Sequence, residues 1–587
     1  RVASIIERID LGYASNLMRV LISLTAAVSM LISLQRALKT TGVTIKYDYI
    51  IVGSGSAGSV LASRLTEDAA NSVLLLEAGG NNRNPLISVP MGFTILHGKA
   101  RYFWRSEGQD EPAIPDRCMS VLQGKGLGGS SSINGMIAVR GHRGDYDEWE
   151  NWGNKGWSYE EVLPYFKRLE ARQEGEATYR GRSGPISVRS GLGDNPLYEA
   201  FRQAILEAGH PQTPDYNGAS QWGVAQTQHC ITQGYARRSS PLGAYLHPAM
   251  QRKNLTVATS AQATRILFEG KTACGIEYQT AGKTHRAMAG SEVIVSAGAY
   301  KTPQLLMLSG IGPADHLRDF HIDAIQHLPG VGQNLQDHLG SFVQHACTQP
   351  ISLLETTKPM GQVKAAIHYA LTGSGALSHY PTEKMAFLKS DPRLDRPDLQ
   401  FYFGPFLRPT VGSSVRSGAM QRHGYVISWC QLRPKCRGSV TLASCDPLSA
   451  PNVLHNYLGT EEDREIQRRA VAMAREFHKQ TAFDVFRGDE LEPGTLCRSQ
   501  KEVDQYIRET CHTHFHPVGT TKMGQDDMAV VDNKLRVHGV ENLRVVDASI
   551  MPRIVGANTN IPTIMIAEKA SDIIRNRPSL QAETINL

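Results

Sequence analysis

The feature that most constrains the fold is a glycine-rich turn between an apolar run and a helical pattern. The stretch YDYIIVGSGSAG ends at Gly58. Its β-rich run, Tyr49–Val52, stops at Gly53, and helical spacing resumes in Val60–Leu65. This order predicts a strand, a tight turn and a helix. Gly53 permits the turn, Gly55 lets a pyrophosphate approach the backbone, and Gly58 lets the helix pack close to the strand.

A single carboxylate follows at the spacing expected of a nucleotide-binding fold. The second expected strand, Val73–Leu76, ends at Glu77, nineteen residues after Gly58. A carboxylate there accepts hydrogen bonds from a ribose diol and would repel a 2′-phosphate. The phosphates would lie at the helix N-terminus, where free N–H groups and the helix dipole favour negative charge. These residues therefore predict FAD or NAD rather than NADP, and they leave the choice between FAD and NAD open.

Two further stretches are unusual. Gly124–Asn134 reads GKGLGGSSSIN and can bring backbone amides against a second face of a large cofactor. Because it leads directly into the apolar run Gly135–Val139, a flexible surface loop is the less favoured interpretation. Gly298–Gly312, GAYKTPQLLMLSGIG, predicts a turn, a helix opened by proline and a glycine stop. On its own this last stretch indicates packing and no chemistry.

Together these motifs resemble the glucose–methanol–choline (GMC) family of FAD oxidoreductases. Three more stretches match the family pattern: GVGQNLQDH at 330–338, HPVGTTKMG at 516–524, and NLRVVDASIMPRIVGANTNIPTIMIAEKASD at 542–572. The motifs stand in the family's order from about Tyr47 to Asp572, and they look most like the choline-dehydrogenase and alcohol-dehydrogenase branch. The resemblance implies FAD as the cofactor.

The resemblance also implies an α/β (α+β) fold with two domains. A doubly wound, Rossmann-like FAD-binding domain would be assembled from residues 46–195, 250–343 and 512–580. A substrate domain, residues 196–249 and 344–511, would carry an antiparallel sheet over the reactive face of the flavin.

Short patterns in the expected substrate domain agree with such a sheet. Leu399–Gly404, Val426–Cys430 and Gly438–Leu442 are β-rich runs broken by turn residues. Glu461–Arg475 mixes charged and apolar residues at helical spacing and predicts a helix.

The resemblance assigns catalysis to His516 and Asn558. Flavin-dependent alcohol oxidation needs a base for the hydroxyl proton and an acceptor, flavin N5, for the hydride. A neutral histidine can accept that proton, and His516 occupies the family's base position. An amide cannot exchange a proton, so Asn558 should hydrogen-bond and orient. The implied reaction oxidises a primary alcohol to an aldehyde, and a quinone-type acceptor or O2 reoxidises the flavin.

The resemblance further implies a set of FAD contacts in the two glycine-rich loops, the acidic strand end and the C-terminal motif. The expected contacts are Gly53, Gly55, Ser56, Ala57, Gly58, Glu77, Ala78, Gly124, Gly128, Gly129, Ser130, Asn134, Gly135, Met136, Ala263, Asp547, Ala548, Thr559 and Asn560. A helix-capping role for Asp547 is a compatible alternative.

Other functions are less favoured. His512, His514 and His516 alternate, but apart from Cys511 no ligand of convincing spacing accompanies them, so no metal is expected. Some relatives are lyases that cleave cyanohydrins or decarboxylate fatty acids in light. The decarboxylating branch has a Cys and an Arg where a hand alignment places Thr382 and Tyr402, which disfavours that activity. A purely binding or structural flavoprotein would leave the His516–Asn558 pair without a task.

Composition limits the partners and the compartment. The net charge of +6 is mild and scattered, so no nucleic-acid partner is expected. Nine widely spaced cysteines do not indicate a disulfide framework and favour a reducing compartment. Within a leader, residues 1–45, the apolar segment Val20–Leu34 would form a helix of roughly 22 Å, shorter than the roughly 30 Å bilayer core. It could be a targeting segment, a peripheral membrane contact through residues 16–38 (cytoplasmic-side or organellar), or a packed helix.

Overall fold

The computed structural model describes residues 46–191, 194–408 and 421–585. The leader and the proposed membrane contact at 16–38 lie outside these residues. The chain divides into Arg1–Lys46 and one compact unit, Tyr47–Leu587. No helix in the described ranges combines the length and apolarity needed to cross a bilayer.

The first large sheet contains the predicted nucleotide-binding strands. Its strand order is β10-β2-β1-β13-β12-β11, with β25 beside β13. Its strands are β1 (Lys46–Val52), β2 (Val73–Glu77), β10 (Leu255–Thr259), β11 (Gln262–Glu269), β12 (Thr272–Thr280), β13 (Lys283–Val295) and β25 (Leu543–Val545). β1, β2 and β10 are parallel, whereas β11, β12 and β13 pair antiparallel. Every residue of β2 is buried, as in a strand covered on both faces.

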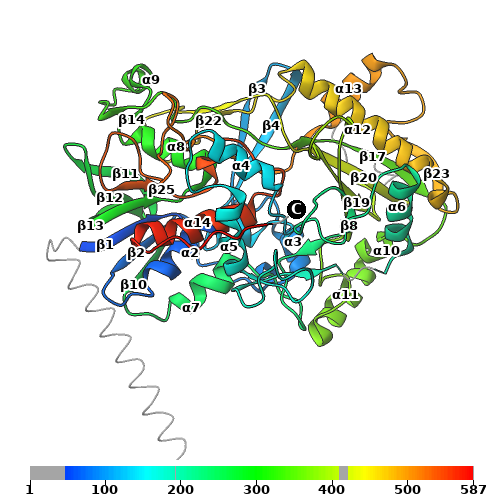
Figure 1. Ribbon diagram of the computed structural model, residues 1–587, viewed down its shortest axis with the longest axis horizontal. Coiled ribbons are helices and arrows are strands. Elements are labelled where there is room, and N and C mark those ends of the chain that lie inside the picture. Colours follow the sequence, from blue (N-terminus) through cyan, green and yellow to red (C-terminus); the bar gives the residue numbers. More distant parts are fainter. Residues whose placement is uncertain (1–45, 192–193, 409–420, 586–587) are drawn as a thin grey trace, which may run out of the picture. The chain divides into compact units, whose positions relative to one another are not determined.

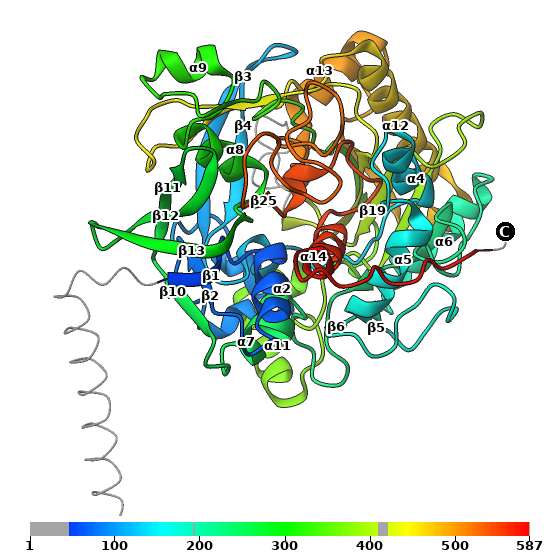
Figure 2. The ribbon, with the colours of Figure 1, turned by 60° about the vertical axis from the view of Figure 1, so that its left-hand side comes forward.

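Two helices from opposite ends of the chain pack beside this sheet. α2 (Ser56–Leu65) follows the predicted turn, and α14 (Asn560–Ile574) lies next to it in both views (Figures 1 and 2). A Cβ added to Gly58 would stand 1.8 Å from the carbonyl oxygen of Gly53. The predicted close approach of helix and turn is therefore present, and only glycine fits there.

Helix α8 (Gly298–Leu308) corrects one expectation. Pro303 lies inside this helix and does not open it. A proline removes the N–H that would bond to the carbonyl four residues earlier, here that of Ala299. The Thr520 hydroxyl donates to this carbonyl instead, at 2.6 Å, so the buried acceptor is satisfied. The predicted glycine stop holds, since Gly310 after the helix has φ of +83°.

The second large sheet is antiparallel throughout, in the order β23-β17-β20-β19-β18-β8. Its strands are β8 (Gly223–Gln226), β17 (Phe342–Cys347), β18 (Lys384–Leu388), β19 (Leu399–Gly404), β20 (Gly424–Gln431) and β23 (Arg487–Glu492). Two of the three predicted β-rich runs are β19 and the centre of β20. The third run, Gly438–Leu442, was expected in this sheet, and that expectation is wrong. It forms β21 (Ser439–Thr441), which pairs with β22 (Asn452–Leu454) in a separate two-stranded sheet.

Helices α6 (Pro196–Glu207), α12 (Glu461–Lys479) and α13 (Gln500–Thr510) lie against this half of the molecule (Figure 1). α12 confirms the predicted helix and extends it to Lys479. Its first turn is acidic, its last turn is basic, and the Thr460 hydroxyl accepts the N–H of Asp463, so charge and cap stabilise both ends.

The remaining elements are short or peripheral. They are α3 (Phe93–Leu96), β3 (Phe103–Glu111), β4 (Ile114–Gly124), α4 (Arg143–Asn151), α5 (Tyr159–Leu169), β5 (Glu170–Ala171), β6 (Ile186–Ser187), β7 (Arg189–Ser190), β9 (Gln228–His229), α7 (His247–Ala249), β14 (Ile311–Gly312), α9 (Ala314–Asp319), β15 (Gln326–His327), β16 (Leu339–Gly340), α10 (Leu354–Thr357), α11 (Pro359–Thr372) and β24 (His512–Thr513).

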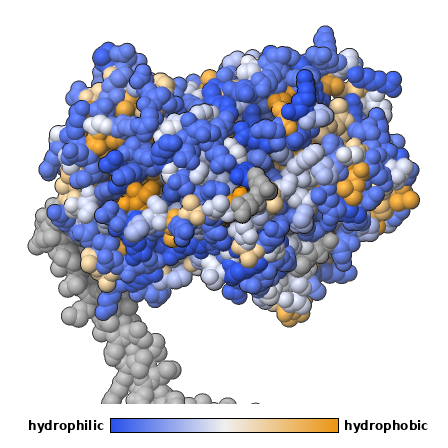
Figure 3. All heavy atoms as spheres, viewed as in Figure 1, coloured by the Kyte–Doolittle hydropathy of each residue, from blue (hydrophilic) through white to orange (hydrophobic). Residues whose placement is uncertain are grey.

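The mixed α/β architecture with two large sheets agrees with the predicted fold class. The domain limits remain a prediction, and the expected boundary at 343 falls inside β17. On the face shown in Figure 3, hydrophilic residues dominate and apolar residues form small, separate patches. Two large clusters of buried apolar side chains include residues of the two large sheets.

Candidate active site

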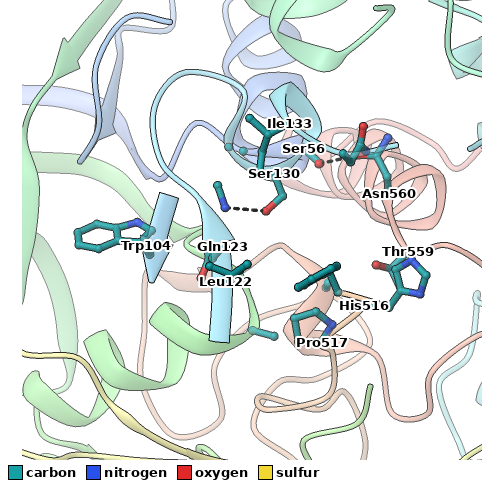
Figure 4. Close-up of a pocket in the computed structure, with 18 of the residues that line it drawn as sticks. Ser56, Trp104, Leu122, Gln123, Ser130, Ile133, His516, Pro517, Thr559 and Asn560 are labelled. Carbon is teal, nitrogen blue, oxygen red and sulfur yellow. Dashed lines mark hydrogen bonds between the residues drawn. The ribbon is translucent and has the colours of Figure 1, made fainter. Parts of the chain in front are cut away.

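One cavity of about 510 Å³ is lined by residues of both large sheets. It brings together the two glycine-rich loops, the end of β2 and the C-terminal motif, as Figure 4 shows for Ser56, Ser130, His516 and Asn560. All but two of the residues predicted for FAD or catalysis line it. The exceptions are Gly58, which packs under the first turn, and Gly128, whose added Cβ would meet the side chains of Ser132 and Leu242.

The first glycine loop forms a cradle for an anion. A Cβ added to Gly55 would meet no atom within 4 Å, and Gly55 lines the cavity, so the space above it is open. Within the part of the chain that the structure describes, no side chain caps the N-terminus of α2, which leaves its first N–H groups available to a ligand. α14 also starts here, and the Ser56 hydroxyl donates to Asn560 Oδ1 at 2.8 Å. Two helix N-termini thus converge on one space, which fits a pyrophosphate.

Glu77 holds the surrounding loops together. Its Oε2 accepts from the N–H and the hydroxyl of Ser54 at 3.1 and 2.6 Å, and its Oε1 accepts from Gly79 and Gly126 at 2.8 and 2.9 Å. These four bonds connect both glycine loops to the end of β2. The sequence predicted a ribose contact for Glu77 but did not indicate this structural role.

Asp547 caps the short helix Ala548–Ile550, which is the helix-capping role given above as an alternative to FAD contact. Its Oδ1 accepts from Ser549 N at 2.8 Å. Its Oδ2 accepts from Gly298 N at 2.8 Å and from the Thr302 hydroxyl at 2.6 Å. The carboxylate therefore joins the C-terminal motif to the start of α8 while it lines the cavity.

The part of the cavity around His516 and Asn558, here called the reactive half, contains a hydrogen-bonded line of side chains. The Nε2 atom of His338 is 3.1 Å from the carbonyl oxygen of Leu432, and the Nδ1 atoms of His338 and His516 are 2.9 Å apart. On the other side of the ring, His516 Nε2 lies 3.1 Å from the amide nitrogen of Asn558. Gln400 donates to Asn558 Oδ1 at 3.2 Å, which turns that amide nitrogen toward His516.

This line fixes the position of each proton. A carbonyl oxygen only accepts, so His338 donates from Nε2 and its Nδ1 carries a lone pair. His516 must then donate from Nδ1, which leaves the lone pair on its Nε2, beside Asn558. The geometry thus places an unprotonated ring nitrogen next to an amide N–H donor in the cavity wall.

Burial keeps both rings neutral. It lowers the pKa of His338 to about 3, and burial together with the neighbouring His338 lowers the pKa of His516 to about 3. The Asp337 carboxylate accepts the backbone N–H of His516 at 2.7 Å and positions the residue.

The alternating histidines all line the cavity, and each has a different partner. His512 accepts from Arg408 at 3.0 Å, and His514 Nε2 is 3.1 Å from the carbonyl oxygen of Trp429. The strand β24 ends at Thr513, and Phe515 has φ of +61°, so the row bends before His516. Among the described residues no group of three or more His, Cys, Asp or Glu side chains is arranged to hold a metal ion.

Three residues of the site, Asp337, His338 and Arg408, were not identified from the sequence. His338 and Asp337 belong to the quoted motif GVGQNLQDH, so their positions were visible and only their roles were not. Arg408 had no signal at all, because it follows β19 in an irregular segment and reaches the cavity only through folding.

The buried neutral histidines predict acid destabilisation. In the folded protein the pKa of His229, His338 and His516 is about 3, below the ordinary value of 6.5. The unfolded chain therefore binds more protons below pH 6.5, so folding stability is full above that pH and falls as pH drops toward 3. Each such histidine contributes up to about 1.4 kcal/mol per pH unit. Urea unfolding at pH 7, 6 and 5 should show a steadily falling free energy of unfolding; a constant or rising value would contradict it.

Comparison with known proteins agrees with this geometry. Residues 47–340 and 434–567 match the N-terminal and C-terminal family models described as GMC oxidoreductase. The chain is 44% identical over 538 residues to an oxygen-dependent choline dehydrogenase of Brucella ovis, covering 91% of this chain and 96% of that one. It is 44% identical over 560 residues to the mitochondrial choline dehydrogenase of Homo sapiens, covering 93% of each. A formate oxidase variant of Aspergillus oryzae RIB40, solved for the effect of the mutation on FAD modification, aligns with a TM-score of 0.83 at 26% identity, covering 91% of this chain and 98% of that one.

A nucleotide cradle that opens onto a buried, neutral histidine suits a flavin-dependent oxidoreductase. With both family models matched across most of its length, the chain belongs to the GMC oxidoreductase family. It is an enzyme that oxidises an alcohol with FAD as cofactor. The alternative of a lyase on the same scaffold is not favoured by these relatives.

Proposed function

We propose that this protein oxidises a primary alcohol to an aldehyde with His516 as the base and Asn558 as its hydrogen-bonding partner. The observation that carries the proposal is the line from Leu432 through His338 to His516, which leaves His516 Nε2 as a lone pair at the cavity wall. A group in that state accepts a proton without first losing one.

Each side chain has a defined task in the reaction. His516 Nε2 accepts the hydroxyl proton of the substrate, and His338 accepts from Nδ1–H of the resulting imidazolium and stabilises it. The Asn558 N–H, which contacts Nε2 in the structure, is placed to donate to the alcohol oxygen as it gains negative charge. When bound, FAD supplies the hydride acceptor, N5. Because burial lowers the pKa of His516 to about 3, the ring is neutral and can accept a proton at neutral pH.

The same proposal assigns FAD binding to the residues predicted from sequence. Gly55, Ser56 and Ala57 would hold the pyrophosphate at the start of α2, with Thr559 and Asn560 approaching from α14. Glu77 would accept from the ribose while keeping its loop contacts. The FAD-binding domain would comprise residues 46–195, 250–343 and 512–580, and the substrate domain residues 196–249 and 344–511.

The electron acceptor and the location are also proposals. We expect O2 or a quinone-type acceptor to reoxidise the enzyme, and the name of the Brucella ovis relative specifies oxygen dependence. An organellar location, with peripheral membrane contact through residues 16–38, would suit a quinone and agrees with the mitochondrial human relative.

Anaerobic stopped-flow spectroscopy tests the proposal. The purified protein should be yellow, and a primary alcohol should bleach its flavin absorbance in the absence of oxygen. Mixing the reduced enzyme with air or with a soluble quinone then identifies the acceptor. Full FAD occupancy without bleaching across a broad panel of alcohols would contradict the proposed reaction.

A further inference from the structure

Arg408 brings an uncompensated positive charge into the reactive half of the cavity. Its Nη1 donates to His512 Nε2 at 3.0 Å, and its guanidinium lies 5.2 Å from the centre of the Phe342 ring. Its backbone N–H donates to the side-chain oxygen of Gln344 at 3.0 Å. Neither side-chain contact supplies a negative charge.

No carboxylate offsets this charge among the described residues. Arg408 forms no described ion pair, and the titratable groups near it are the hydroxyls of Tyr380 and Tyr506 and the rings of His512 and His514. Burial lowers the pKa of the guanidinium, which shows that the surroundings disfavour its charge. The segment that follows, 409–420, reads PTVGSSVRSGAM and contains no Asp or Glu.

The other described residues of the cavity wall give this charge no neutralising partner. The carboxylates among its lining residues are Glu77 and Asp547, and both are held by the nucleotide loops. The reactive half is lined instead by aromatic and neutral groups: Tyr380, Thr382, Tyr402, Phe403, Phe406 and Ser428. A trialkylammonium substrate could contact these rings, but it would share the cavity with Arg408 and meet no opposite charge.

We propose that Arg408 is a substrate-recognition residue that binds an anionic group, so that the preferred substrate is a primary alcohol with a carboxylate at its far end. This rests on the proposed alcohol oxidation and defines its substrate class. A guanidinium held by a neutral histidine keeps donors free for a carboxylate, and such charge-assisted bonds are strong where water is excluded.

The position of Arg408 sets the length of that substrate. The rings of His512, His514 and His516 form a row with centroid separations of 5.0 and 6.3 Å. Arg408 contacts the first of these rings, and the base is the last. The carbinol and the carboxylate must therefore be separated by several bonds, as in an ω-hydroxycarboxylate. A short cation such as choline would find no opposite charge in this half of the cavity. It is also too short to contact both His516 and Arg408.

A matched series of alcohols tests the inference. The substrates are 6-hydroxyhexanoate, its methyl ester and 6-hydroxyhexyltrimethylammonium, and the apparent Kd comes from anaerobic flavin reduction of the holoenzyme. The wild type should bind the anion about tenfold or more tightly than the ester, and the cation more weakly than either. Arg408→Gln should reduce the anion-to-ester preference to near one. Arg393→Gln, which removes an exposed arginine paired with Asp391, is the matched control and should retain the preference.

Binding without turnover separates the two proposals. Hexanoate should perturb the flavin absorbance of the wild type and compete with 6-hydroxyhexanoate, whereas hexyltrimethylammonium should not. If hexanoate binds but no alcohol reduces the flavin, the proposed reaction fails and the anion site stands. If the alcohols react while the wild type prefers the cation, or Arg408→Gln leaves the anion-to-ester ratio unchanged, the recognition role of Arg408 is wrong. The hexanoate measurement needs only the wild type, so the test does not depend on folding of the variant.

Discussion

Replacing His516 by alanine is expected to slow flavin reduction by roughly 10²–10⁴-fold while leaving FAD bound. In the proposed reaction the ring is the base, and its Nε2 is the atom that the hydrogen bonds through His338 leave unprotonated. The backbone of residue 516 is held by Asp337, a contact that the substitution does not remove. The expected effect is therefore on the rate of reduction at saturating alcohol, measured by stopped flow, with the FAD content determined from absorbance.

The control for this result is His368→Ala, which removes an exposed imidazole on α11 and should leave reduction unchanged. His338→Phe tests the positioning role separately. It keeps an aromatic ring but removes the acceptor for His516 Nδ1–H, so reduction should slow about tenfold or more with little change in the KM for the alcohol. If His516→Ala reduced its flavin at the wild-type rate, another residue would have to be the base. Loss of FAD from that variant would show that His516 is structural.

The second large effect concerns two glycines three residues apart. Gly58→Ala should destabilise the fold, because its Cβ would lie 1.8 Å from the carbonyl oxygen of Gly53, a backbone atom that cannot rotate away. Overpacking of this kind costs about 1–3 kcal/mol or more. Gly55→Ala should fold normally, since its φ is −67° and its Cβ meets nothing within 4 Å, but the methyl group would occupy the phosphate cradle.

The two variants should therefore separate stability from cofactor binding. Urea unfolding should show a clear loss for Gly58→Ala and a change within about 0.5 kcal/mol for Gly55→Ala. FAD retention after gel filtration should fall at least tenfold for Gly55→Ala. Full FAD occupancy in Gly55→Ala would mean that the pyrophosphate does not approach this loop, and a stable Gly58→Ala protein would mean that the turn can shift.

Local patterns in the sequence were sufficient for much of the fold. The runs before Gly53 and before Glu77 correctly predicted the central parallel strands. A short apolar segment that ends at a glycine or a single acid is compatible with few secondary structures other than a buried strand. β19 and α12 were found for similar reasons. Gly438–Leu442 was assigned to the wrong sheet and Pro303 to the wrong place in its helix, because strand pairing and the hydroxyl of Thr520 are contacts between distant segments that no local pattern contains.

The features of the candidate site also divide into those that local sequence patterns predict and those that depend on tertiary contacts. The sequence by itself determined the nucleotide cradle and, through its family motifs, the positions of His516 and Asn558, since spacing along one turn or one motif is a local property. Tertiary structure alone decided which nitrogen of His516 carries the lone pair, because that depends on the carbonyl of Leu432 acting through His338. It also placed Arg408 in the cavity wall without a described carboxylate partner, because the electrostatic surroundings of a side chain are set by every segment packed around it and by none of them alone.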